Sequence, residues 1–494
     1  MNHPASDIRA LEPHAVWRAF ADLCQVPRPS KHEAAAIRHV ETWAEQHGWP
    51  HRRDAVGNVV VTVPARGAAD GAPIVVLQAH LDMVCEQDAG TDHDFHRDPI
   101  RPWIDDDGWV RADGTTLGAD NGLGVALMMA AAEADFPRPP LELLFTVDEE
   151  TGLTGASALD PALVTGRLLI NLDCEDDAYV IVGCAGAAGG TLRLPIARAA
   201  AFADVAPMTL RISGLRGGHS GVDIHRGRGN ALHLLAEALR ALVEVHPQVA
   251  VTGFSGGGQG NAIPREAEAH LLLPPTAAVA VTERLQAVET AIRARLGDAD
   301  PGVRLRLDVA PNDHPPPFTE TTRTHLLDLI AALPQGAITY SPALAELVET
   351  SYNLAVATDD GEVITLVAGC RSSDNAALAE AEARLRALAA DHGASIEAAR
   401  SYPGWAPTPD APIVQRTIDV YGRLFDDAPT VTAVHAGLEC GVLADRLPGL
   451  EAVSIGPTIR DPHSPDERAS IASVALIWRW LEALLADLAA APSA

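Results

Sequence analysis

The sequence is poor in basic residues, in long apolar runs and in paired cysteines. It has 37 Lys+Arg against 66 Asp+Glu and a net charge of −29, which argues against nucleic acid or an anionic membrane as a partner. No stretch holds about 18 uninterrupted apolar residues, and the charged N-terminus lacks the apolar core of a signal peptide. We therefore expect a soluble cytoplasmic protein with no nucleic-acid or membrane partner.

The six cysteines show no C-x-x-C spacing; they are Cys24, Cys85, Cys174, Cys184, Cys370 and Cys440. This pattern indicates neither a disulfide framework nor a thiolate zinc site. Any metal is therefore expected to be held by histidine and carboxylate side chains.

The order of apolar patterns predicts a split catalytic domain. With 494 residues the chain suggests two or three domains. Residues 1–186 alternate helical patterns with short β-rich runs such as PIVVLQ and LELLFTV, as in an α/β domain. The pattern of residues 187–401 predicts an inserted α+β domain of one-sided antiparallel sheets, with a weak internal duplication. Residues 402–494 begin with a Pro-rich linker and then show the α/β pattern again, which predicts the second part of the catalytic domain.

The stretch QAHLDMVCE places His80 and Asp82 where a buried strand is expected to end. In an extended chain residues i and i+2 point to the same side, so the two side chains lie next to each other. This arrangement suits a metal-ligating histidine and the carboxylate that orients it. For the pair alone, a simple hydrogen-bonded pair at a strand end is the better explanation.

More polar side chains occupy ends of elements in the two α/β parts. Asp120 lies in a Gly-rich turn ahead of a helix, the acidic run 148–150 and Asp173 follow buried strands, and His463 lies in a loop after another β run. Each alone could be a helix cap or a surface loop residue. The carboxyl edge of an open sheet is, however, where α/β proteins build their sites. Such a set of N and O ligands fits zinc, manganese or cobalt and can hold two ions.

Ordered motifs along nearly the whole chain resemble a known peptidase family. They are AHLDMV, GTTLGADNGLGVA, DEETGLTGA, NLDCED, GGHSGVDIHRGRGNA, GNAIPREA, HAGLECG and DPHSPDE. Together they resemble the bacterial aminoacyl-histidine (Xaa-His) dipeptidases of the di-zinc metallopeptidase clan. The resemblance implies a zinc-peptidase-like α/β fold with a mixed central sheet, split by an inserted α+β lid domain.

The resemblance also implies roles for residues of the α/β parts. Asp120 would bridge two zinc ions, or Co²⁺ or Mn²⁺ in their place. The other ligands would be His80 and Asp173 on one ion and Glu150 and His463 on the other. Asp82 would orient His80, and Glu149 would be the general base for a metal-activated bridging water. Family members also hold the peptide bond after the bridging aspartate in the cis form.

In the inserted domain the resemblance implies an oxyanion donor, His219, that polarises the scissile carbonyl. Weaker candidates for substrate contacts follow from the remaining motifs: Asn261, Arg371, His435, Gly437 and Glu439. Arginine suits a terminal carboxylate, although most arginines are merely solvated.

These observations favour a cytosolic di-zinc dipeptidase that hydrolyses Xaa-His dipeptides such as carnosine. The alternatives are a dipeptidase or tripeptidase of broader specificity in the same clan, and an inactive metal-binding relative. The intact Glu149 beside a full ligand set argues against inactivity. A duplicated lid domain could replace the partner subunit of smaller relatives, so monomer and homodimer both stay open.

Overall fold

The computed structural model describes residues 7–200, 204–311, 314–399 and 401–490. The chain forms two compact units: unit 1 comprises Met1–Cys184, Trp405–Ala433 and Leu438–Ala494, and unit 2 comprises Ala185–Gly404 and Val434–Gly437. The borders at 184/185 and 404/405 lie two or three residues from those expected from sequence. Residues 434–437, expected in the last part of the catalytic domain, belong to unit 2. The outermost ends of the expected domains, 1–6 and 491–494, lie outside the described residues.

Unit 1 is built on an eight-stranded mixed sheet. In spatial order its strands are β1 (His51–Arg53), β2 (Val59–Val63), β6 (Leu141–Thr146), β3 (Val75–His80), β7 (Leu168–Asn171), β21 (Glu451–Ser454), β8 (Tyr179–Cys184) and β20 (Thr430–Val434). The central strands β6, β3, β7 and β21 run parallel, whereas β1, β2 and β8 pair antiparallel. Every residue of β3 and β6 is buried, as expected for parallel strands covered on both faces. The mixed α/β sheet predicted from sequence is confirmed.

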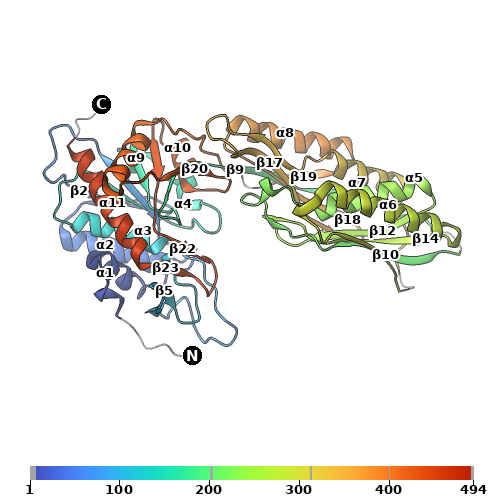
Figure 1. The fold of residues 1–494 in the computed structure, drawn as a ribbon, viewed down its shortest axis with the longest axis horizontal. Helices are drawn as coiled ribbons and strands as arrows, with labels where there is room; N and C mark the ends of the chain where they lie inside the picture. Colours follow the sequence, from blue (N-terminus) through green and yellow to red (C-terminus); the bar gives the residue numbers. More distant parts are fainter. Residues whose placement is uncertain (1–6, 201–203, 312–313, 400, 491–494) are drawn as a thin grey trace. The chain divides into compact units, whose positions relative to one another are not determined.

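The helices of unit 1 pack on this sheet or on one another (Figure 1). They are α1 (His14–Leu23), α2 (Ala34–His47), α3 (Ala119–Glu133), α4 (Thr154–Ala158), α9 (Pro412–Phe425), α10 (Glu439–Arg446) and α11 (Ile471–Ala489). Helix α3 packs on β3 and β6, while α9 and α10 pack on β8 and β21. Within the described ranges, no helix combines the length and the apolar character that a membrane crossing requires.

A small four-stranded sheet in unit 1 completes the frame around the candidate site. Its order is β22 (Ile459–Arg460), β23 (Arg468–Ser470), β5 (Trp109–Ala112) and β4 (Pro102–Ile104). The β22–β23 connection carries His463, and β5 leads to the irregular first turn of α3, which carries Asp120. His80 ends β3, and the acidic run 148–150 and Asp173 follow β6 and β7. The parallel strands therefore bring these side chains to the same carboxyl edge of the main sheet.

Unit 2 is built on one antiparallel sheet with helices against it (Figure 1). In spatial order its strands are β15 (Arg304–Val309), β10 (Ala206–Ser213), β14 (Ala267–Leu273), β12 (Ala250–Gly257), β17 (Val348–Asp359), β18 (Val363–Ser372), β9 (Gly186–Pro195) and β19 (Ser395–Ala398), and β16 (Gly336–Tyr340) pairs with β17. The helices are α5 (Ala231–Val245), α6 (Ala278–Leu296), α7 (Glu320–Ala332) and α8 (Asn375–Asp391). A separate ribbon joins β11 (Gly218–His219) to β13 (Ala262–Ile263).

Short 3₁₀ helices occur in both units, at Ile8–Ala10, Pro161–Leu163, Ile224–Arg226, Pro275–Ala277 and Gly297–Ala299.

The topology of unit 2 contains the duplication predicted from sequence. One repeat runs β10-α5-β12-β14-α6-β15, and the other runs β9-α7-β17-β18-α8-β19. From the outer edge of the sheet inwards, the first repeat places its strands in the order β15, β10, β14, β12, and the second repeat in the order β19, β9, β18, β17. Counted along each repeat, both orders are fourth, first, third and second strand, and the innermost strands, β12 and β17, pair with each other. The predicted α+β architecture of this part of the chain is confirmed.

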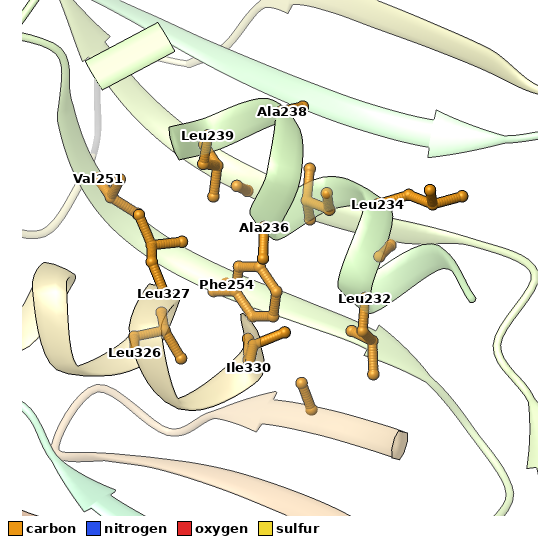
Figure 2. Packing of buried hydrophobic residues seen from close by; sticks show 14 of the residues in the cluster. Leu232, Leu234, Ala236, Ala238, Leu239, Val251, Phe254, Leu326, Leu327 and Ile330 are labelled. Atoms are coloured by element: carbon orange, nitrogen blue, oxygen red, sulfur yellow. The ribbon is translucent and has the colours of Figure 1, made fainter. Parts of the chain in front are cut away.

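The core of unit 2 lies between its helices and the sheet (Figure 2). Leu232, Ala236 and Leu239 of α5 follow a helical period and face Phe254 of β12, against which Ile330 of α7 also packs. Burying an aromatic or aliphatic side chain of this size stabilises the fold by about 1.5–3 kcal/mol. This core fixes the strands and loops that carry the candidate substrate-binding residues of unit 2.

Candidate functional site

Asp120 is the centre of the polar cluster at the carboxyl edge of the unit 1 sheet. Its Oδ1 lies 3.0 Å from His80 Nε2, and its Oδ2 lies 3.1 Å from His463 Nε2. Asp173 Oδ1 lies 3.5 Å from the same nitrogen of His80, and Glu150 Oε2 lies 3.1 Å from the same nitrogen of His463. The two oxygens of one carboxylate are thus shared between two histidine–carboxylate pairs.

These spacings fit two divalent metal ions. Ligand atoms about 2.0–2.1 Å from a tetrahedral zinc lie roughly 3.3 Å from one another. The distances around His80 and His463 are close to that value. Glu150 Oε1 is also buried without a hydrogen-bond partner in the described part of the chain, and ligand atoms of His80, Asp120 and Glu150 lie within 4.8 Å of one another. A bound cation would satisfy this buried carboxylate oxygen.

The electrostatics of the cluster also call for positive charge. Burial raises the pKa of Glu149 well above its ordinary value, and the carboxylates of Asp173 and Glu150 raise it further although His80 lowers it. Burial likewise raises the pKa of Asp173 to about 6 and that of Glu175 to about 8, with neighbouring carboxylates adding to the effect. Bound cations would offset this accumulation of negative charge.

Asp82 holds the exit of β3 and the turn after β6 together. Its backbone carbonyl and its Oδ1 lie 3.2 and 3.3 Å from His80 Nδ1. The carboxylate also accepts hydrogen bonds from the backbone N–H groups of Glu149 and Glu150 and from Ser30 Oγ. Burial raises the pKa of Asp82, but the bond to His80 and these donors outweigh it and lower the pKa to about 2. An ionised Asp82 accepts a hydrogen bond from Nδ1–H of His80, which would leave the Nε2 lone pair free for a metal ion shared with Asp120 and Asp173.

Asp82 also lies within 4.8 Å of two further buried carboxylates, those of Glu33 and Asp148. Glu33 Oε1 accepts hydrogen bonds from the backbone N–H groups of Lys31 and Asp148, and Asp148 Oδ1 accepts one from Thr151. These oxygens are occupied by donors of the protein itself. The three carboxylates therefore hold the loops around Asp82 together.

Glu149 differs from the neighbouring Glu150 in its partners. Its side chain is partly exposed and makes no hydrogen bond to any described part of the chain, whereas Glu150 contacts His463. The peptide bond between Asp120 and Asn121 is cis, which confirms the prediction from the family resemblance. The structure thus gathers all residues proposed from sequence as ligands, together with Asp82 and Glu149, within unit 1.

Unit 2 holds a second polar cluster, which includes His219, Arg371 and His435. His219 Nδ1 accepts hydrogen bonds from the backbone N–H groups of Gly221 (3.2 Å) and Val222 (3.0 Å). Nδ1 is therefore unprotonated, and we assign the proton of the neutral ring to Nε2. Burial lowers the pKa of His219, and the positive charge of Arg371 lowers it further. His219 thus presents an N–H donor and stays neutral.

A cavity of about 260 Å³ lies on the sheet of unit 2 beside this cluster. Its floor includes the small residues 187–190 and 368–369, and its polar lining includes Ser220, Ser351 and Arg371. His435 Nε2 lies 2.7 Å from Ser351 Oγ. Burial and the charge of Arg371 lower the pKa of His435 to about 4, so that residue is neutral as well.

The other substrate candidates occupy different positions. Asn261 is exposed, and its carbonyl accepts a hydrogen bond from Ser220 N. Gly437 lies against Tyr402, where an added Cβ would be 2.9 Å from the tyrosine oxygen. Glu439 is 0% exposed in unit 1, where Gln78 Nε2 and Thr146 Oγ1 each donate to its Oε2 at 2.6 Å. The first two are accessible to a ligand in their loops, whereas Glu439 belongs to a buried network beneath the ligand set.

Comparison with known proteins agrees with this geometry. The model of peptidase family M20/M25/M40 matches residues 76–487. The cytosol non-specific dipeptidase of Escherichia coli is 37% identical over 98% of this chain and 100% of its own length. An aminoacylhistidine dipeptidase from Vibrio alginolyticus has a crystal structure that matches with a TM-score of 0.92 and 37% identity over 99% of both chains.

More distant structures share the fold alone. The aminopeptidase PepT from Bacillus cereus is 18% identical, with a TM-score of 0.57 over 97% of this chain and 99% of its own. The resemblance predicted from the sequence motifs is confirmed by the close relatives and by the family match. The chain belongs to peptidase family M20/M25/M40, and it is an enzyme, a metallopeptidase.

Proposed function

We propose that this metallopeptidase is a cytoplasmic dipeptidase that hydrolyses Xaa-His dipeptides with two divalent metal ions, zinc in the first place. The observation that carries the proposal is the position of Asp120, whose two oxygens serve two histidine–carboxylate pairs at 3.0 and 3.1 Å. His80 and Asp173 would hold one ion, and Glu150 and His463 the other. When bound, the ions lower the pKa of a water molecule and polarise the substrate carbonyl.

The residues of unit 1 have distinct tasks in this proposal. Glu149, whose carboxylate has no hydrogen-bond partner among the described residues, takes a proton from the attacking water and delivers it to the leaving amine. Asp82 keeps His80 in the tautomer that leaves Nε2 free and holds the turn that bears Glu149.

The residues of unit 2 are proposed to act on the substrate. His219 Nε2–H would donate to the carbonyl oxygen as negative charge develops there. Arg371 would pair with the terminal carboxylate of the dipeptide at the polar side of its cavity, with Asn261, His435 and Gly437 in neighbouring loops. The buried Glu439 is better placed to support the floor of the metal site than to touch substrate.

A second candidate function is a dipeptidase of broad specificity, because the Escherichia coli relative carries the name non-specific dipeptidase. An assay of amino-acid release from carnosine, Gly-His and Gly-Leu, with and without chelator, separates the candidates. The Xaa-His proposal requires chelator-sensitive cleavage of carnosine and Gly-His well above that of Gly-Leu. Equal rates on all three would favour the broad enzyme, and no release from any of them would contradict both.

The proposed role of Arg371 predicts discrimination against a blocked C-terminus. The C-terminal amide of an Xaa-His dipeptide should be cleaved with a kcat/KM at least about tenfold lower than that of the free acid, because it cannot form the charge-assisted pair. An Arg371→Met variant, which removes the positive charge, should lose most of this difference, whereas Arg371→Lys should keep part of it; chromatographic rate measurements on both substrates detect the change. Equal turnover of acid and amide by the unchanged enzyme would refute the assignment.

For His219, the proposal predicts a change in kcat more than in KM. His219→Ala should lower kcat about a hundredfold and change KM little, because an oxyanion contact strengthens only in the transition state. The matched control is His225→Ala, which removes an exposed histidine from the neighbouring 3₁₀ helix of the same unit and should leave both constants unchanged. A His219→Ala enzyme with normal kcat would exclude an oxyanion role.

A further inference from the structure

Four consecutive backbone N–H groups at the start of α3 converge on one carboxylate, that of Glu467. Oε2 accepts hydrogen bonds from Leu117 N (2.7 Å) and Gly118 N (2.9 Å), and Oε1 accepts them from Ala119 N (2.8 Å) and Asp120 N (3.3 Å). Glu467 is 2% exposed. Such N–H groups at a helix start are commonly capped by a nearby side chain. Here the cap comes from a loop about 350 positions further along the chain.

A buried arginine holds the same turn from another direction. Arg28 is 3% exposed, and its Nη1 donates to the carbonyls of Leu81 (3.1 Å) and Asp82 (2.9 Å), which follow β3. Its Nη2 donates to the carbonyl of Gly118. Gly118 has φ +67°, and a Cβ there would lie 2.5 Å from this nitrogen, so both the backbone conformation and the close approach require glycine.

These bonds connect the segments that carry three of the proposed ligands. Glu467 lies four residues after His463 and binds the turn of Asp120, while Arg28 binds that turn to the segment after His80. Both oxygens of Glu467 are filled by backbone donors, so this carboxylate is not itself available as a metal ligand. Its effect on a metal must act through the position of the turn.

We propose that Glu467 is a positioning residue: it sets the distance between the Asp120 and His463 side chains and thereby the affinity of the ion that these two residues share with Glu150. The proposal rests on the proposed metal site. It concerns a side chain that neither contacts the ion nor meets the substrate. Partners that orient metal ligands in this way typically contribute about 10–100-fold to metal affinity.

The test is Glu467→Gln. Glutamine has nearly the same volume and keeps one accepting oxygen, but its NH₂ group would face two backbone N–H donors. In metal-free protein, amide hydrogen exchange of peptides covering residues 115–122 should accelerate at least about tenfold. In calorimetric zinc titration, one of two equivalents should bind about 10–100-fold more weakly, and excess zinc should restore most of the lost activity. Because zinc binding stabilises the folded state of any variant, the weaker binding of one equivalent, and not the rescue alone, separates a positioning role from a general structural one.

The matched control is Glu142→Gln in β6, at the end of the sheet away from the ligands. Glu142 is also buried and accepts hydrogen bonds from the backbone N–H groups of Thr165 (2.8 Å) and Gly166 (2.9 Å). This variant should be less stable than the wild-type protein. Its affinity for zinc and the amide hydrogen exchange of residues 115–122 should not change. An equal loss of zinc affinity in both variants would overturn the proposal.

A Glu467→Gln variant that is folded by circular dichroism and binds both zinc equivalents with wild-type affinity would also overturn it. If the variant does not fold, amide hydrogen exchange is measured in the metal-free wild-type protein. The amides of residues 117–120 should be protected by Glu467, and exchange as fast as in an exposed loop would refute the positioning role of Glu467. This readout needs no substrate. If the enzyme cleaved no dipeptide but the amides of residues 117–120 were protected, the proposed function would be rejected and the hydrogen bonds of Glu467 to this turn would still stand.

Discussion

Replacing Glu149 by glutamine should lower kcat between about a hundredfold and about ten-thousandfold while metal content stays at the wild-type level. Glutamine keeps the size and polarity of the side chain but cannot accept a proton from water. KM should change little, because the variant removes a step of the reaction and not a contact with the bound substrate. Steady-state rates on an Xaa-His dipeptide, together with metal analysis of the same preparation, measure both quantities.

The control for Glu149→Gln is Glu45→Gln, the same change at an exposed position on α2 of the same unit, which should leave rate and metal content unaltered. Loss of an equivalent of zinc from Glu149→Gln would mean that Glu149 is a ligand and that Glu150 is the proton acceptor. An unchanged kcat in Glu149→Gln would show that Glu149 is not the general base.

Replacing Asp120 by alanine should lower the rate of hydrolysis at least about a thousandfold. The purified variant should also contain less of both metal ions. The reason is geometric: one carboxylate approaches both histidines, so its loss weakens both positions at once. Asp120→Asn keeps the shape but not the charge of a bridging ligand and should show a similar loss. Metal analysis after gel filtration and rates on an Xaa-His dipeptide measure the two effects.

The appropriate control is Asp106→Ala in the exposed turn between β4 and β5, which should keep metal and rate. His80→Ala gives the complementary case, since it removes a side chain that serves only one of the two positions. Asp120→Ala with an unchanged content of metal would refute the bridging position.

The sequence was informative about where the proposed ligands lie, because each occupies a recognisable position at the end of an element; their roles as ligands come from the family resemblance and stay a prediction. His80 ends a strand whose residues are all apolar or buried, and Asp173 follows another such strand. Parallel strands necessarily bring their carboxyl ends to one edge. The duplicated repeat of unit 2 could likewise be predicted, because an amphipathic strand followed by a helix occurs in both halves.

The residues that anchor the site could not be predicted in the same way. Arg28 and Glu467 bind backbone atoms of distant segments, and a bond from a side chain to the main chain requires no particular residue type at the other end. The assignment of 434–437 to unit 2 depends on the path of the chain at Ala185, whose N–H bonds to the carbonyls of Val434 and Ala436. The burial of Glu439 follows from packing against Gln78 and Thr146, which lie about 300 positions or more away in sequence.

The central claim is that two metal ions held around Asp120 are required for dipeptide hydrolysis. Titration of zinc into chelator-stripped protein, with histidine release from carnosine or Gly-His followed at each addition, tests it most directly. We predict no release without metal and a rate that rises until about two equivalents are bound. Full activity at one equivalent, or activity that persists in the metal-free protein, would contradict the claim.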